Sequence, residues 1–337
     1  MKYYIEKCLH GEHLTTKEAS RALEIIMSGS ATDVQIAGLL VALRAKGETI
    51  DEIVGFAQTM RSKSVRISVD DSAAIDMCGT GGDGSGTFNI STVASFVAAG
   101  AGITVAKHGN KSVSSRCGSA DVLVELGVKI DLTPEKAAES INSIGIGFLF
   151  APMFHPSMKY AGKARSELGI KSIFNILGPL TNPAGVDRQL IGTYNNTTAE
   201  KLAHASHSLG SHHVCVVYSR EGVDEVILSG TTSVHEMRRE NPVESYEVHA
   251  GSFHLPSHVL DVLKGSGKEE NARIALQVLR GDPSPARDVV VANAAFGLYV
   301  SGKVQNIIEG VAAAEESINS GRAMQKLNHL VDFSRTA

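Results

Sequence analysis

A run of glycines between two structured segments constrains this chain more than any other part of its sequence. Four glycines occupy residues 79–84, directly behind the short apolar run 73–75, and the polar segment 89–92 then begins a helical pattern. Glycine lets the backbone adopt positive φ and approach a ligand closely. A helix N-terminus adds free N–H groups and the positive end of a dipole. A strand, a glycine-rich loop and a hydroxyl-rich helix start together predict a cradle for phosphate groups, and a tight turn without a ligand is the alternative.

The first sixty or so residues contain only helical patterns. Three capping boxes, in which side chains satisfy the free N–H groups of a helix start reciprocally, precede periodic apolar sets: Thr15-x-x-Glu18, Thr32-x-x-Gln35 and Thr49-x-x-Glu52. Gly29 and Gly47 lie where helices commonly end. We therefore predict a small all-helical domain over residues 1–66.

Beyond residue 66, strand-like runs alternate with helical patterns. The strand candidates are 74–77, 103–107, 148–150, 214–218 and 225–228, and the helix candidates are 91–100, 120–126, 134–144, 198–209 and 271–279. Thr133 is the expected N-cap of the helix at 134–144, and the run 289–301 is expected to be a buried helix. This alternation predicts an α/β domain over residues 67–337 with a mostly parallel central sheet. Helices from about 158–184 are expected to pack back onto the N-terminal helices.

Composition excludes several classes of protein. The 32 lysines and arginines against 36 aspartates and glutamates give a net charge of −4, which does not favour nucleic acid or an anionic membrane surface as a partner. No apolar run approaches the roughly 20 residues of a membrane span, and the N-terminus lacks a signal-peptide core. The four cysteines show no metal-binding or disulfide spacing, so a reducing cytoplasmic setting is expected.

Two further segments carry groups suited to phosphate and metal. Lys107 and Lys111 belong to a serine-rich segment that follows the apolar strand run 103–105, at the carboxyl end of a strand, where ligands bind in open α/β sheets. Asp224 and Glu225 precede an apolar run, and adjacent carboxylates suit Mg²⁺, which takes oxygen ligands. The alternatives are a solvated basic loop and a solvated acidic turn. The glycine run is not expected to be a dinucleotide-binding fingerprint, and the P-loop pattern GxxxxGK[ST] is absent. We therefore expect neither a dinucleotide nor a nucleoside triphosphate as the ligand.

Isolated polar residues are harder to assign. Arg165 lies on a predicted helix, where its planar fork would match a carboxylate if it faced the ligand site. His108 and His155 lie on predicted loops, and structural hydrogen bonding is the alternative to a general-base role for each. Cys78 and Cys117 are expected to fill space, because no His/Asp arrangement supports a covalent mechanism.

Taken together, these segments closely resemble the anthranilate phosphoribosyltransferases of tryptophan biosynthesis. The matching motifs come in the family's order over nearly the whole chain: 79–83 (GTGGD), 89–92 (NIST), 107–110 (KHGN), 119–123 (SADVL), Arg165, 178–183 (GPLTNP) and Asp224-Glu225. Each motif is weak alone and specific in combination.

The resemblance implies a helical domain beside an α/β domain, a ligand cleft between them, and a homodimer formed through the helical domains. It implies phosphoribosyl pyrophosphate (PRPP) and anthranilate as substrates, with Mg²⁺ as the cofactor. It assigns PRPP binding to Gly79, Gly82, Asp83, Thr87, Asn89, Ile90, Ser91, Thr92, Lys107, Asn110, Ser115 and Ser119. It assigns anthranilate binding to Gly79, His108, Asn110, His155 and Arg165, and Mg²⁺ binding to Ser91, Asp224 and Glu225. His108 is the candidate for a general base.

Two other functions stay open at this level. Pyrimidine nucleoside phosphorylases are related transferases with a glycine-rich loop and a lysine–histidine pair, but Asn110 and Arg165 in their contexts argue against that activity. A non-catalytic relative that binds nucleic acid would have a basic surface and an eroded acidic pair, whereas this chain is acidic and retains Asp224 and Glu225.

Overall fold

The computed structural model describes residues 1–111 and 117–337. Ser115, which the resemblance assigns to PRPP, lies outside the described residues, as do Ser112, Ser114 and Arg116 of the same loop.

The N-terminal helices begin where the capping boxes predict. The helices are α1 (Lys2–Leu9), α2 (Thr16–Met27), α3 (Asp33–Lys46) and α4 (Ile50–Lys63). The three threonines of the boxes each accept a hydrogen bond from the N–H group three residues ahead at 3.3 Å, and the Glu or Gln side chain there accepts one from the threonine N–H. The predicted starts of α2, α3 and α4 are therefore confirmed.

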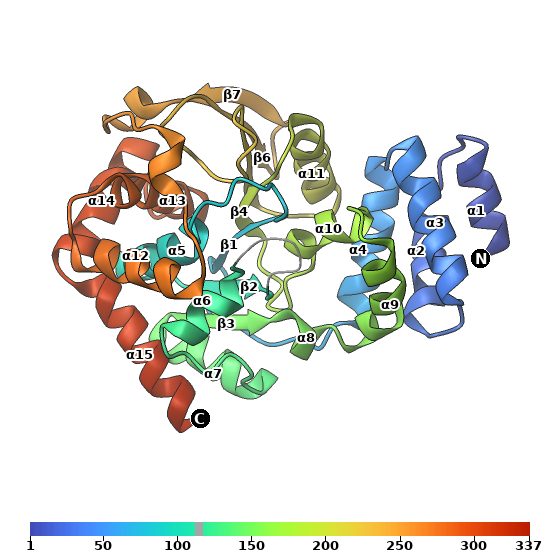
Figure 1. Ribbon diagram of the computed structural model, residues 1–337, viewed down its shortest axis with the longest axis horizontal. Helices are drawn as coiled ribbons and strands as arrows, with labels where there is room; N and C mark the ends of the chain where they lie inside the picture. Colours follow the sequence, from blue (N-terminus) through green and yellow to red (C-terminus); the bar gives the residue numbers. More distant parts are fainter. Residues whose placement is uncertain (112–116) are drawn as a thin grey trace.

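A second segment of the chain packs against these helices. Helices α9 (Lys159–Leu168) and α10 (Ile173–Leu177) share one apolar core with α2, α3 and α4. The rings of Phe56 in α4 and Phe174 in α10 meet edge to face with centroids 6.4 Å apart. Figure 1 shows α1–α4 and α9 gathered at one end of the molecule, with the N-terminus among them. Because α9 and α10 also continue toward the sheet, this helical part and the α/β part are joined by more than one stretch of chain.

The described residues form a seven-stranded sheet in the order β3-β2-β1-β4-β5-β6-β7. The strands are β1 (Ile75–Gly79), β2 (Val105–Gly109), β3 (Ile146–Phe150), β4 (Arg188–Gly192), β5 (His213–Ser219), β6 (Thr232–Arg238) and β7 (Glu244–Val248). Neighbours from β3 through β5 pair in parallel, and β6 and β7 add antiparallel pairs at one edge. The predicted α/β fold with a mostly parallel sheet is confirmed.

Helices cover the sheet on both faces. Helix α13 (Pro285–Ser301) is buried along its length beside α5 (Ile90–Gly100), which confirms the buried helix expected at 289–301. Thr133 caps α7 (Pro134–Ile144) as predicted, accepting the N–H of Lys136. The remaining helices are α6 (Ser119–Glu125), α8 (Ala151–Phe154), α11 (Asn196–Ser208), α12 (Lys268–Arg280), α14 (Ile307–Asn319) and α15 (Arg322–Thr336). None of the described helices is long and apolar enough to cross a lipid bilayer.

The strand predicted at 225–228 is wrong. Val226, Ile227 and Leu228 are fully buried, but they lie in a loop rather than in the sheet. Asn293 of α13 accepts the N–H of Val226 at 3.1 Å and donates to its carbonyl at 2.8 Å, so a side chain replaces the strand partner. Thr232 accepts the N–H of Ile227 in the same way. The segment was predicted as a strand because it is apolar, but a buried loop can be just as apolar as a buried strand. Strands β4, β6 and β7 were not predicted.

Candidate active site

A large cavity lies between the carboxyl ends of the central strands and the helical part of the molecule. It encloses about 620 Å³, within the usual range of small-molecule sites. Loops that follow β1, β2, β3 and β5 form one wall, and α9, α10 and Met60 of α4 contribute to the other. This position matches the general rule for ligands in open α/β sheets. We call this space the central cavity.

The glycine-rich loop lines the central cavity. Gly81, Gly82 and Gly84 adopt φ values of +66°, +70° and +76°, a region open to glycine at little cost. A Cβ atom added at Gly79 would lie 2.5 Å from Asp224 Oδ2, so this position also requires a glycine for close approach. The glycines do match the spacing GxGxxG, but α5 begins only at Ile90, well after the last of them. The loop is therefore a wide cradle rather than the tight helix-entry turn of a dinucleotide fold.

Helix α5 presents its N-terminus to the central cavity. Asn89 occupies the N-cap position but makes no capping hydrogen bond with its side chain. Instead, its amide donates to Cys117 O at 3.2 Å and accepts from Asn271 Nδ2 at 3.0 Å. Ser91 and Thr92 of the first turn also line the cavity, and Thr92 Oγ1 has no hydrogen-bond partner among the described residues. These N–H and hydroxyl groups form a site suited to an anion.

Asp224 and Glu225 face the glycine loop and the start of α5. Asp224 Oδ2 accepts the N–H of Gly81 at 2.9 Å, and Glu225 Oε1 accepts the N–H of Ser91 at 3.0 Å. Asp83 is tied to the same loop, because its Oδ2 atom accepts the N–H of Asp224 at 3.4 Å. Burial raises the pKa of both carboxyl groups, and repulsion from neighbouring carboxylates raises it further. A divalent cation would relieve that repulsion, and two carboxylates with the Ser91 hydroxyl are the oxygen donors that Mg²⁺ prefers.

Lys107 lines the central cavity beside the first turn of α5. Its side chain is only 4 % exposed, and Nζ donates to Met77 O and lies 3.4 Å from Ser91 Oγ. It therefore supplies a positive charge between the end of β1 and the first turn of α5. A buried ammonium group in this position favours a negatively charged ligand.

Two neighbouring histidines also line the central cavity. The rings of His108 and His155 are 5.1 Å apart between centroids and tilted by 54°. Burial lowers the pKa of His108 to about 3 and that of His155 to about 4. Both imidazoles are therefore neutral near pH 7. His108 Nε2 has no hydrogen-bond partner among the described residues, so it is available to a ligand.

Arg165 of α9 lines the central cavity on the side of the helical part. Its guanidinium carbon lies 5.0 Å from the centroid of the Phe174 ring, which holds it against the cavity wall. Burial lowers the pKa of this guanidinium, and no carboxylate among the described residues pairs with it to oppose that effect. A half-buried arginine without a counter-ion is a site for a ligand carboxylate. Asn110 lies in the same lining, its Oδ1 accepting the N–H of Lys111 at 2.8 Å.

The structure brings nearly all of the predicted site residues to one cavity. Those that line it are Gly79, Gly82, Asp83, Thr87, Asn89, Ser91, Thr92, Lys107, His108, Asn110, Ser119, His155, Arg165, Asp224 and Glu225. Ile90 does not line it, because its side chain is fully buried in the apolar core under α5. Sequence reasoning missed Asn271 of α12, Lys159 of α9 and the apolar side chains of Met60 and Phe174, which carry no motif of their own.

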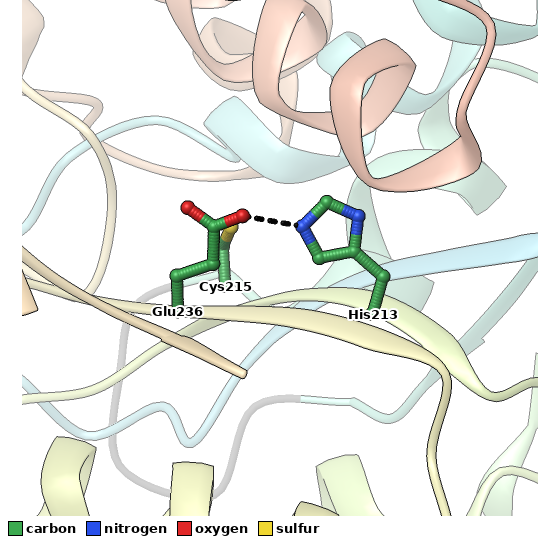
Figure 2. Close-up of side chains that lie close together, drawn as sticks. All are labelled: His213, Cys215 and Glu236. Atoms are coloured by element: carbon green, nitrogen blue, oxygen red, sulfur yellow. Dashed lines mark hydrogen bonds and ion pairs between the residues drawn. The ribbon is translucent and has the colours of Figure 1, made fainter. Parts of the chain in front are cut away.

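A second group of potential metal ligands lies outside the central cavity, around the amino end of β5. His213, Cys215 and Glu236 bring their ligand atoms within 4.8 Å of one another, and Figure 2 shows the carboxylate turned toward the imidazole. The carboxylate is already engaged, with His213 Nε2 at 2.8 Å and donors from Arg238 and Tyr246 at 2.8 and 2.9 Å. Burial keeps the pKa of the Cys215 thiol high. This cluster is a saturated structural network rather than a metal site.

Comparison with known proteins agrees with this arrangement. Residues 71–324 match the family described as "Glycosyl transferase family, a/b domain", and residues 2–64 match its "helical bundle domain". The anthranilate phosphoribosyltransferase of Pelotomaculum thermopropionicum is 50% identical over 334 residues, covering 99% of this chain and 96% of that protein.

Solved structures give the same result. The crystal structure of anthranilate phosphoribosyltransferase from Thermus thermophilus is 41% identical and superposes with a TM-score of 0.93 over 98% of this chain and 99% of that one. The Saccharomyces cerevisiae enzyme in complex with PRPP and Mg is 30% identical, with a TM-score of 0.91 over 100% of this chain and 98% of that one. The chain therefore belongs to the anthranilate phosphoribosyltransferase family.

Proposed function

We propose that this protein transfers the phosphoribosyl group of PRPP to the amine of anthranilate, releasing pyrophosphate, as a step of tryptophan biosynthesis. The observation that carries the proposal is the set of charged groups that line the central cavity. The loops at the carboxyl ends of the strands supply a glycine cradle, a helix N-terminus, Lys107 and two carboxylates, and α9 of the helical part supplies Arg165, which has no counter-ion among the residues described. A substrate rich in phosphate and a substrate with a carboxylate match these two sets of groups.

PRPP would occupy the end formed by the glycine loop and α5. The free N–H groups of the loop and the first turn of α5 would bind phosphate oxygens, and Lys107 would balance their charge. Ser119 would contribute its hydroxyl from the start of α6. The yeast relative was solved with PRPP and Mg, which supports this assignment.

Mg²⁺ would be held by Asp224, Glu225 and Ser91. Bound there, it would stabilise the negative charge that develops on the leaving pyrophosphate. The oxygen-only donor set supports this cation over softer ones. Repulsion of Asp224 by Asp83 and of Glu225 by Asp224 supports a cation of high charge.

Anthranilate would bind with its carboxylate on Arg165 and near the amide of Asn110. The apolar side chains of Met60 and Phe174 would pack against its ring. A neutral His108 can accept a hydrogen bond from the aromatic amine, and it is the candidate for the group that receives the proton after attack on the ribose. Much of the rate would come from holding the amine and the ribose carbon in line, an effect of about 7–11 kcal/mol at most.

We also infer that two copies of the chain associate through the helical part. Tyr3 and Leu9 of α1 and Val34 and Val41 of α3 are exposed apolar side chains on two neighbouring helices, which supports a covered surface there. The mass of the particle in solution, measured by light scattering, tests this. Four free thiols support a reducing, cytoplasmic location.

Loss of anthranilate fluorescence on addition of PRPP and Mg²⁺ tests the proposed activity directly. The fluorescence of anthranilate should fall only when the protein, PRPP and Mg²⁺ are all present, and control reactions omit each of these three in turn. A pyrimidine nucleoside phosphorylase would instead release thymine when it is given thymidine and phosphate. An unchanged anthranilate signal with folded protein would contradict the proposal.

A further inference from the structure

The sheet is interrupted between β1 and β2 at the edge that faces the central cavity. Strand β1 pairs with β4 over five residues and β2 pairs with β3 over five, whereas the register between β1 and β2 contains the single pair Ile75 and Val105 in these fully described strands. Past that pair, main-chain groups of both strands need other partners, because buried polar groups are costly to leave unpaired.

Side chains fill this gap. Asp76 Oδ1 accepts the N–H of His108 at 3.2 Å, and Asp76 Oδ2 accepts from Asn182 Nδ2 at 2.9 Å. The Asn182 amide also donates to Ala106 O at 2.8 Å, and Lys107 donates to Met77 O. Three side chains therefore take the place of the sheet hydrogen bonds where β1 and β2 separate.

Asp76 is a buried residue, and each oxygen of its carboxylate accepts a hydrogen bond. Its side chain is 0 % exposed. Burial raises the pKa of this carboxyl, whereas the nearby Lys107 ammonium and the two hydrogen bonds oppose that rise. Since both oxygens accept hydrogen bonds, the ionised form fits the site, and it provides Lys107 with a counter-charge inside the protein.

The groups around Asp76 belong to different parts of the lining of the central cavity. Lys107 lies 3.4 Å from Ser91 Oγ in the first turn of α5, and His108 lies beside His155 of the segment after β3. Asn182 follows the segment Gly178–Thr181, from which Gly178, Pro179 and Thr181 line the cavity. The Asp76 carboxylate does not itself line the cavity. It accepts hydrogen bonds from His108 and Asn182 and offsets the charge of Lys107, so it acts on three parts of the cavity wall.

We propose that Asp76 is a positioning residue, whose carboxylate fixes Lys107, His108 and Asn182 in the separated strands so that both substrates are held in line. The inference rests on the proposed phosphoribosyl transfer. It predicts that Asp76 matters for rate even though it does not reach the cavity, because small displacements of aligned groups have large effects on rate.

The test compares Asp76→Asn and Asp76→Ala with Glu236→Gln. Glu236 is also a buried, hydrogen-bonded carboxylate of the same sheet, but it lies away from the cavity. All variants are assayed well below their melting temperatures. Asp76→Ala should lower kcat/KM for PRPP and for anthranilate on the order of 100-fold. Asp76→Asn keeps an acceptor for the His108 N–H and should lose less. Glu236→Gln should lower the melting temperature while kcat and both KM values stay at the wild-type level.

Asn182→Ala provides a second arm in case the Asp76 variants do not fold. It removes one contact of the same carboxylate and should lower kcat/KM for both substrates in the same direction. Wild-type kinetics in folded Asp76 or Asn182 variants would overturn the inference while leaving the proposed function intact. Equal kinetic losses in Glu236→Gln would overturn it as well, since they would show a general effect of stability. A wild-type protein that does not consume anthranilate with PRPP would overturn the proposed function and this inference together.

Discussion

Asp224 and Gly81 are 143 residues apart in the sequence and are joined by a hydrogen bond of 2.9 Å between the Asp224 carboxylate and the Gly81 N–H. This bond makes the acidic loop after β5 and the glycine loop after β1 a single structural unit. A change in the shape of either loop is therefore expected to alter the other.

Gly79→Ala tests that coupling. The added Cβ would meet Asp224 Oδ2 at 2.5 Å, so the carboxylate must move, and overpacking of this kind costs about 1–3 kcal/mol. We expect kcat/KM for PRPP to fall and the Mg²⁺ requirement to rise. Gly162→Ala in α9 is the control, because nothing lies within 4 Å of its added Cβ. It should leave the kinetics unchanged and stabilise the helix by about 0.5–1 kcal/mol. Normal metal dependence in Gly79→Ala would contradict the coupling.

The double change Asp224→Asn with Glu225→Gln should raise the Mg²⁺ concentration that gives half-maximal activity by about tenfold or more, since the number of ligand charges sets affinity over orders of magnitude. A titration of initial rate against Mg²⁺ measures this. Asp187→Asn, on a carboxylate paired with Arg239 away from the cavity, serves as the control. A wild-type titration curve in the double variant would remove both residues from the metal site.

Arg165→Ala should raise the KM for anthranilate and spare that for PRPP. Loss of a charged hydrogen bond costs about 1.5–3 kcal/mol, which corresponds to roughly 10- to 100-fold. Arg165→Lys keeps the charge but not the planar fork, so it should recover only part of the loss. Steady-state kinetics with each substrate varied in turn measures the difference. An equal rise in both KM values would exclude the carboxylate-binding role.

His108 and His155 should make the folded protein less stable in acid. Their pKa values of about 3 and about 4 lie below the value of about 6.5 expected in the unfolded chain. Below pH 6.5 the unfolded chain therefore binds protons that the native protein does not, and the free energy of unfolding falls as the pH drops toward 4. Urea unfolding between pH 7 and pH 5 measures this slope, which His155→Gln should reduce. The same slope in wild type and variant would argue against a buried neutral His155.

The parts of the fold that were predicted are those encoded locally. The capping threonines Thr15, Thr32, Thr49 and Thr133 act on N–H groups three residues away, so the sequence contains the whole interaction. Strand β6 was missed because it buries the polar side chains of His235 and Glu236, which hides the apolar alternation. Apart from Arg238 of β6 itself, their partners lie on other elements. The buried loop at 226–228 was misassigned because its hydrogen-bond partner Asn293 is 67 residues away and cannot be inferred from the local sequence.

The candidate site was predictable where a motif marks it. Glycine, lysine and acidic motifs identified three loops that the fold brings to one cavity, although the binding role of each residue stays a prediction. Asn271 could not be found this way, because it is a single asparagine on α12 with no motif around it, although it lines the cavity and donates a hydrogen bond to Asn89. Ile90 was included because it lies within a motif, yet the helical period directs its side chain into the core.

The contact between Glu225 and the Ser91 N–H has a consequence for the order in which ligands enter. In the free protein, a carboxylate from a distant loop already occupies the end of α5 that a phosphate would use. Two anions at one helix end repel each other unless a cation lies between them. If Mg²⁺ binds at Glu225 as proposed, its charge would offset this repulsion, so we expect PRPP to bind more tightly in the presence of Mg²⁺ than in its absence.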